Sequence, residues 1–202
     1  MPASRRHLPA DERRAVTVEA VLALAATVNP ADITTAAIAE HMQLTQGALF
    51  RHFPTKEALW DAVMQWVAEH LLACIDRAPA EHDGPLEALR AMFMSHVDFV
   101  VAHPGVPRML FSELQRASPS PAKKRARALL AAYGARLSSR IERGQASGVI
   151  TRHVDAHAAA TLFIGTVQGL VMQALLSGDL RRIRRDAPAV FDIYQRGVME
   201  QR

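Results

Sequence analysis

Apolar positions recur at helical spacing along most of the chain, and Pro or Gly separates the segments that carry them. In the first segment, residues 11–28, Ala20, Leu24 and Val28 fall on one helix face, and Asn29-Pro30 ends the pattern. Further helices are predicted at 34–41, 45–53, 55–77, 86–102, 106–116, 121–147, 155–177 and 187–201. No segment reads as a confident strand. The pattern therefore predicts an all-α fold, with a small three-helix head at the N-terminus fused to a helical bundle.

Polar residues at helix starts support this division. Thr34 or Thr35, Thr45 and Thr55 each precede a short apolar run, and Asp155 precedes the most apolar helix. Such side chains accept hydrogen bonds from the free N–H groups of a first helical turn. We expect residues 1–60 to form one domain and residues 61–202 a second, larger one.

Composition narrows the cellular setting. Half of the 202 residues are apolar, which favours a packed core over a disordered chain. Cys74 is the only cysteine, as expected of a protein from the reducing cytoplasm, and residues 1–14 lack the apolar stretch of a signal peptide. The longest apolar stretch, 158–176, contains Thr161, Gln168 and Gln173, so we interpret it as a buried helix and expect no membrane span.

Residues 34–53 carry the clearest motif, TTAAIAEHMQLTQGALFRHF. Two short helices are separated by a tight turn at Gln43-Leu44, with Ile38 and Ala39 facing inward from the first helix and Leu49 and Phe53 from the second. This is the pattern of a helix-turn-helix, in which the second helix enters the DNA major groove and the first crosses the backbone. The net charge of +4 suits such a partner, but residues 1–60 are neutral overall, so the prediction depends on where individual charges lie.

In this motif the sequence resembles the tetracycline-repressor (TetR) family. The match runs over about residues 12–62 and comprises Ile33-Thr34-Thr35, Ile38-Ala39, Leu44-Thr45-x-Gly47-Ala48-Leu49-Phe50-x-His52-Phe53 and Lys56-Glu57-x-Leu59. Farther on, His103-Pro104-Gly105 with Phe111, and a late apolar helix, are also similar to members of that family. The resemblance implies a two-helix DNA reader, a ligand-responsive C-terminal domain and a homodimer.

The resemblance assigns a DNA-contacting role to eight residues, and Phe50 and Arg51 complete a candidate set of ten. It implies phosphate contacts from Thr34 and Thr35, further phosphate contacts from His52 and Lys56, and groove contacts from Thr45, Gln46, Gly47 and Ala48. Two departures from the family pattern matter. Phe50 stands where the family often has Tyr, so a hydroxyl for phosphate is missing, and Asn29-Pro30 replaces the usual Gly-rich exit from the first helix.

Side-chain chemistry supports these roles independently of the resemblance. Helix N-termini and Thr hydroxyls donate to phosphate, Gly47 allows close approach of the backbone, and Gln46 can bond adenine through N6 and N7. Lys56 opposes the dipole of its own helix, a cost that a nearby phosphate would explain. Simpler interpretations stay open: the threonines as plain caps, Gln46 and Arg51 as solvated surface, and Phe50 as core.

The C-terminal region is predicted to bind a small, largely apolar effector and a second copy of the chain. Pockets are mostly apolar with a few polar groups, and the candidate lining residues are Trp66, Phe93, His96, Val97, Met109, Phe111, Leu114, Tyr133, Phe163, Gln168 and Met172. Ordinary core packing is the alternative for each. The helix at 155–177 is apolar nearly all round, and Gly165 and Gly169 allow close helix approach. With the last helix it is the expected dimer seam, the alternative being burial within one subunit; the arginines at 181, 182, 184 and 185 are interpreted as a solvated loop.

Other classes of protein fit less well. His153, Asp155 and His157 resemble a metal trio, but Asp155 stands where a helix cap is expected, and the two geometries conflict. No Gly-rich phosphate loop, nucleophile elbow or zinc-helix motif is present, so neither an enzyme nor a cofactor is expected. A DNA-coating protein without an effector remains the alternative. We therefore expect a cytoplasmic repressor that binds a pseudo-palindromic double-stranded operator and is released by a small molecule.

Overall fold

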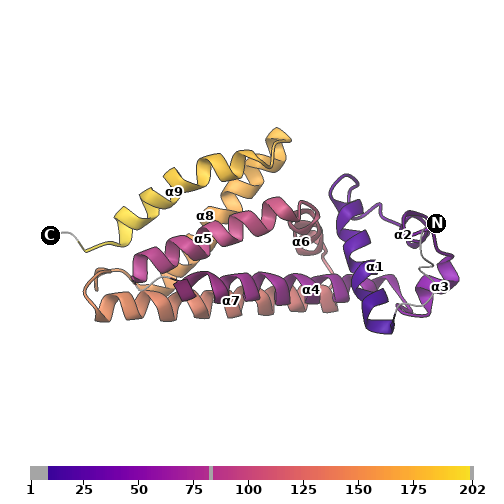
Figure 1. The fold of residues 1–202 in the computed structure, drawn as a ribbon, viewed down its shortest axis with the longest axis horizontal. Helices are drawn as coiled ribbons and strands as arrows, with labels where there is room; N and C mark the ends of the chain where they lie inside the picture. The colour runs from indigo at the N-terminus through magenta and orange to yellow at the C-terminus, as the bar shows by residue number, and fades with distance from the viewer. Residues whose placement is uncertain (1–8, 82–83, 201–202) are drawn as a thin grey trace. The chain divides into compact units, whose positions relative to one another are not determined.

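The computed structural model describes residues 9–81 and 84–200, and within these it is helical with no β-strand, as predicted (Figure 1). Its helices are α1 (Ala10–Ala25), α2 (Thr35–His41), α3 (Gln46–Phe50), α4 (Lys56–Arg77), the 3-10 turn η2 (Ala78–Glu81), α5 (Pro85–Ala102), α6 (Gly105–Gln115), α7 (Pro121–Ala146), α8 (Ala156–Ser177) and α9 (Arg182–Val198). The chain divides into two compact units, and each unit is formed by two separate segments of the sequence. Unit 1 comprises Met1–Val67 and His103–Ala126, and unit 2 comprises Ala68–Ala102 and Arg127–Arg202.

Unit 1 has a small core to which each of its helices contributes. Four side chains in this core are at most 2% exposed: Val21 of α1, Ile38 of α2, Leu49 of α3 and Leu59 of α4. α6 packs closely on α1 at Gly105, where an added Cβ would lie 2.0 Å from the carbonyl oxygen of Leu22. Glycine therefore permits an approach between α1 and α6 that a side chain would prevent.

Unit 2 has an aromatic core formed by α5, α7, α8 and α9. Phe93 lies 5.2 Å from both Phe163 and Phe191 between ring centroids, and Phe163 lies 5.5 Å from Tyr194. These tilted and edge-to-face pairs bury large apolar area and stabilise the packing of the helices. After α9 the chain returns to the loop before α8, where Thr151 N donates to Val198 O at 3.0 Å.

The predicted caps are confirmed, and several helix boundaries differ from the predicted ones. Residues 26–28 continue α1 only as hydrogen-bonded turns, and likewise 51–53 after α3, so both helices end before the predicted residue. The interpretation of 181–185 as a solvated loop was wrong, because α9 already begins at Arg182. Its first turns are held by side-chain pairs, Arg182 with Asp186 at 2.8 Å and Arg184 with Asp98 at 2.7 Å. Pro188 lies inside the helix, although it reads in sequence as a start signal.

α8 is long and apolar enough, by length and composition alone, to cross a membrane, with a mean hydropathy of 1.6 over its most apolar 18 residues. A single helix of this kind is weak evidence for a membrane span, since core helices pass the same test. Phe163 and Val167 are fully buried in unit 2, whereas Leu162, Met172 and Leu176 are 58%, 43% and 81% exposed. One face of α8 thus belongs to the core and the other presents apolar side chains to the surface of the unit.

Candidate DNA-binding and effector sites

The predicted helix-turn-helix is present as α2 and α3. Thr34 caps α2 by accepting from Ala37 N at 3.1 Å, and Thr45 caps α3 by accepting from Ala48 N at 3.2 Å. In both, the hydroxyl oxygen acts as acceptor, which leaves its own hydrogen free to donate to a phosphate oxygen. Cap and phosphate contact are therefore compatible at these two positions.

The turn between the helices has a left-handed residue at Gln43, with φ of 56°. Leu44 N donates to Ala39 O at 2.8 Å across this turn, which is the six-to-one bond of a Schellman motif. Gly, and less often Asn, usually occupies this conformation, so a glutamine here is uncommon. The bond fixes where α3 begins relative to the end of α2, and so sets the spacing between the two helices of the reader.

The surface of α3 presents most of the residues assigned to the groove. Gln46 and Gly47 are exposed, Ala48 is half-buried, and Phe50 is 41% exposed. Gln46 Nε2 donates to Thr35 Oγ1 at 3.1 Å, so in the free protein its amide is already oriented by α2. Gly47 has no atom closer than 3.9 Å to a virtual Cβ, which leaves open space for a base edge.

The end of α3 is held by an arginine that the sequence analysis did not single out. Arg14 Nη1 donates to the carbonyl oxygen of His52 at 2.8 Å, and its guanidinium carbon lies 4.5 Å from the centroid of the Phe53 ring. His52 is half-buried, and Arg51 is exposed at the C-cap of α3. Arg14 thus fixes α3 to α1 from outside the motif, and no spacing rule in the sequence would have pointed to it.

Lys56 lies at the start of α4 among groups that restrain it. Its Nζ donates to Ala31 O at 3.5 Å and lies 4.8 Å from the centroid of the Trp60 ring. Burial, and then the neighbouring charge of Arg116, lower the pKa of Lys56, while Asp32 raises it. An ammonium group with a like charge nearby gains from an anionic partner, as expected of a residue that contacts a phosphate.

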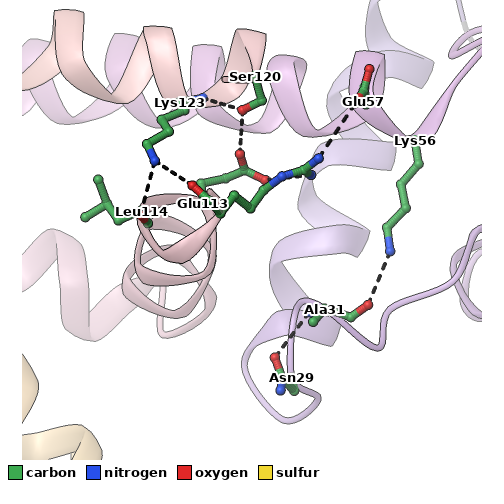
Figure 2. A network of polar contacts seen from close by, with 9 residues as sticks. Asn29, Ala31, Lys56, Glu57, Glu113, Leu114, Ser120 and Lys123 are labelled. Carbon is green, nitrogen blue, oxygen red and sulfur yellow. Dashed lines mark hydrogen bonds and ion pairs between the residues drawn. The ribbon is translucent and has the colours of Figure 1, made fainter. Parts of the chain in front are cut away.

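A polar network joins the end of α6 to the starts of α4 and α7, as Figure 2 shows. The buried carboxylate of Glu113 accepts from Ser120 Oγ at 2.7 Å. Arg116 lies 3.5 Å from Glu113 and 3.7 Å from Glu57 of α4. Lys123 donates to the carbonyl oxygens of Leu114 and Arg116 at 3.3 and 2.6 Å. Through the ion pair between Arg116 and Glu57, the network links the end of α6 to the first turn of α4, which also carries Lys56.

The predicted effector residues fall into both units. Trp66, Met109, Phe111 and Leu114 lie in unit 1, where the Trp66 ring meets His103 edge-on with centroids 5.1 Å apart. Met109 is fully buried and Leu114 is 39% exposed. The remaining predicted residues lie in unit 2: Phe93, His96, Val97, Tyr133, Phe163, Gln168 and Met172. Among these, Phe93, His96, Tyr133 and Phe163 form one ring cluster, whereas Met172 is 43% exposed on α8.

Two surface hollows lie among the described residues of unit 2, and none of the predicted effector residues lines either of them. One, of about 490 Å³, is an apolar groove between α8 and α9 that includes Leu162 and Ile193. The other, of about 330 Å³, lies beside Ile75 and Met92 and is bordered by arginines 136, 140 and 143. Arg136 is paired with Asp76 at 2.6 Å. Among the described residues no cluster of His, Cys, Asp and Glu could hold a metal, and Asp155 caps α8 by accepting from Ala158 N at 2.7 Å.

Two family models match the chain over most of its length. Residues 15–63 match the model described as bacterial regulatory proteins, tetR family, and residues 82–172 match the model described as tetracyclin repressor-like, C-terminal domain. The chain belongs to the TetR family of bacterial regulatory proteins, as the motif in residues 34–53 suggested.

The chain is also similar in sequence to curated relatives and in fold to solved structures. The chain is 31% identical over 78 residues to the nucleoid occlusion factor SlmA of Vibrio vulnificus, a match that spans 39% of this chain and 40% of that protein. Among solved structures, it is similar to the ketosteroid transcriptional regulator KstR2 of Mycobacterium tuberculosis, with a TM-score of 0.77, 20% identity and coverage of 94% and 96% of the two chains. It is also similar to the fatty acid degradation regulator FadR of Bacillus halodurans, with a TM-score of 0.82, 16% identity and coverage of 98% and 100% of the two chains. At these identities the two structures show a shared fold.

Proposed function

We propose that this chain is a homodimeric transcriptional repressor that binds a pseudo-palindromic operator through α3 and releases it when a small, largely apolar effector binds. The single observation that carries the DNA-binding role is the capped α2–α3 pair, with Thr34 and Thr45 at two helix N-termini and Gln46 and Gly47 exposed on α3. Helix N-termini favour phosphate, and an exposed α3 suits a major groove. No catalytic step and no cofactor enter this role.

The donors of α2, α3 and α4 support a division of the proposed DNA contacts. Thr34, Thr35 and Thr45, with His52 and Lys56, supply donors to backbone phosphates, and Arg51 adds a charge at the rim. Gln46, Gly47, Ala48 and Phe50 face base edges, with Gln46 exchanging its bond to Thr35 for one to a base. Phe50 carries no hydroxyl, but its exposed ring can pack against a thymine methyl group.

A second copy of the chain covers the apolar face of α8 and α9. Leu162, Leu176 and Ile193 are 58%, 81% and 67% exposed, and the groove between these helices is apolar. Exposed apolar patches of this kind mark protein interfaces. A symmetric dimer would supply the two reading heads that two half-sites require, about 34–36 Å apart.

The effector role draws on the fold and its neighbours. The structure of the transcriptional regulator FadR of Bacillus subtilis in complex with stearoyl-CoA has a TM-score of 0.76 to this chain, with 17% identity and coverage of 90% and 97%. We propose that the ring cluster of unit 2 is the effector site, and that residues 61–202 act as the effector and dimer domain behind a DNA-binding domain at 1–60. The likeness to nucleoid occlusion factors favours a second candidate, a DNA-binding protein without an effector.

Selection of random duplex DNA by the purified protein tests the proposal. We expect enrichment of one pseudo-palindrome that binds at nanomolar concentration and weakens steeply with salt, because phosphate contacts release counterions. The variant Thr45→Val with Gln46→Ala, which removes a cap and a base-reading side chain together, is the comparison and should enrich this pseudo-palindrome more weakly, with relaxed preference at one base pair of each half-site. If the unmodified protein enriches no sequence at moderate salt, the proposed function is wrong.

A further inference from the structure

Among the described residues of unit 2, two buried side-chain polar atoms have no hydrogen-bond partner. They are Nδ1 of His96 on α5 and the hydroxyl oxygen of Tyr133 on α7. Tyr133 is 1% exposed, and the two rings lie 5.4 Å apart between centroids at 61°. Leaving a buried polar atom unpaired costs about 1–3 kcal/mol, and most such atoms are paired with protein or water. Because the two rings are neighbours, we look for one partner that would satisfy both unpaired atoms.

The surroundings of the pair are aromatic. Tyr133 lies against Phe163, with 6.2 Å between ring centroids, and Phe163 in turn contacts Phe93 and Tyr194. The chain has two tyrosines, and the other one, Tyr194, donates its hydroxyl hydrogen to Ala159 O at 3.2 Å. The same core thus pairs one tyrosine hydroxyl and leaves the other unpaired.

His96 adds a second property. It lies so deep that burial lowers the pKa of its imidazole to about 4, so the ring is neutral at pH 7. The two unpaired atoms therefore belong to uncharged groups, one on α5 and one on α7, with aromatic side chains around them.

We propose that the effector carries a neutral hydrogen-bonding group, a carbonyl or hydroxyl on an apolar body, and that Tyr133 and His96 bind this group. The inference rests on the effector role proposed above and names the chemistry of its ligand. A carbonyl oxygen accepts from the Tyr133 hydroxyl and, in one tautomer, from Nδ1–H of His96. A hydroxyl accepts from Tyr133 and donates to Nδ1 in the other tautomer. A carboxylate would exchange its hydration for two uncharged partners and is disfavoured.

Calorimetry with three probes of equal chain length, 2-octanone, 2-octanol and octanoate, tests the proposal at pH 7.5. We expect the ketone and the alcohol to bind and octanoate to bind more weakly than either. Tyr133→Phe, which removes only the hydroxyl, should weaken ketone binding about three- to tenfold, the worth of one neutral hydrogen bond. The matched control Tyr194→Phe should leave it unchanged. The proposal is overturned if no probe binds, if octanoate binds best, or if Tyr133→Phe has no effect.

A second measurement needs no ligand. In the free protein Tyr133→Phe should leave the melting temperature unchanged or raise it, because an unpaired hydroxyl is removed. Tyr194→Phe should lower it, because the bond to Ala159 is lost. If both variants are destabilised alike, the Tyr133 hydroxyl is already paired and the inference fails. Operator selection with Tyr133→Phe separates this failure from that of the proposed function, since the inference leaves DNA binding unaffected.

Discussion

The ammonium nitrogen of Lys56, at the start of α4, lies 3.5 Å from the carbonyl oxygen of Ala31 in the loop before α2 (Figure 2). The side chain of Lys56 thus connects α4, which follows the helix-turn-helix, to the loop that precedes it. Asn29 shapes the same loop, its side-chain oxygen accepting from Ala31 N at 3.2 Å. The Asn29-Pro30 departure from the family pattern therefore has a structural role, since it presents the carbonyl that Lys56 binds.

The first prediction separates phosphate contact from base reading. Lys56→Ala should weaken binding to every sequence about equally and lower the salt slope by about 1, because it removes one phosphate contact. Gln46→Ala should relax preference at one base pair of each half-site, at about 1–3 kcal/mol. Titrations of operator variants at several salt concentrations measure both, with Lys124→Ala on the exposed side of α7 as control. Equal weakening of all sites by both variants would show that Gln46 does not read bases.

The second prediction concerns the dimer. Leu162→Glu places a charge on the exposed apolar face of α8 and should yield a folded monomer by sedimentation and circular dichroism, because a charge at an apolar interface remains unpaired. Operator affinity should fall with it, since two heads must bind together. Ala131→Glu, at an exposed position of α7, should stay dimeric. A Leu162→Glu protein that remains dimeric would place the seam elsewhere.

The third prediction tests the close packing of α6 on α1. Gly105→Ala should lower the free energy of unfolding by about 1–3 kcal/mol, because its Cβ would overlap the backbone oxygen of Leu22 and both helices would have to shift. Gly134→Ala is the control: nothing lies within 4 Å of its virtual Cβ, and alanine favours the helix by up to about 1 kcal/mol. Chemical denaturation of both variants gives the comparison. Equal stabilities would mean that α1 and α6 separate without cost.

The fourth prediction is acid sensitivity from His96. Burial lowers the pKa of its imidazole from 6.5 to about 4 in the folded protein. The unfolded chain therefore takes up the proton first, and stability that is complete above pH 6.5 is lost as the pH falls toward 4, by an amount on the order of 3 kcal/mol. His96→Leu should flatten the dependence of melting temperature on pH in this window. His153→Gln, at an exposed position, should retain it, and a steep wild-type slope that survives in His96→Leu would contradict the assignment.

Local chemistry made the secondary structure predictable. The caps at Thr34, Thr45 and Asp155 involve residues within three positions of each other, so the sequence shows both partners. The start of α9 was missed because its first turns depend on Asp98, 86 residues before Arg184. The contact between Arg116 and Glu57 likewise joins distant segments that no spacing relates. Sequence therefore located the reader but not the contacts that orient it.

The predicted effector residues illustrate the same limit. Apolar and aromatic character selected all of them, yet only Phe93, His96, Tyr133 and Phe163 form one ring cluster, while Trp66 meets His103 in the other unit. Residue type alone does not distinguish a pocket wall from ordinary core, because both are built from the same side chains. The unpaired atoms of His96 and Tyr133 are visible only once hydrogen bonds can be counted.

The last prediction asks whether α4 carries the signal between the two functions. α4 runs without a break from Lys56 in unit 1 to Arg77 in unit 2, and the two tryptophans of the chain, Trp60 and Trp66, both lie on it. Trp60 lies buried beside Lys56, while Trp66 meets His103 edge-on. Intrinsic tryptophan fluorescence therefore reports on this helix alone.

A helix that moves as a rigid body would transmit a shift at one end to the other. In Trp60→Phe protein, whose emission comes only from Trp66, we expect the selected operator to change the emission and a scrambled duplex of equal length to leave it unchanged. If 2-octanone releases the operator, it should reverse that change, and linkage requires operator DNA to weaken 2-octanone binding by the same factor by which 2-octanone weakens DNA binding. Calorimetry of the free and operator-bound protein measures that factor. Unchanged Trp66 emission at saturating operator would show that α4 does not carry the coupling, and equal 2-octanone affinities with and without operator would mean that this ligand is not coupled to DNA binding.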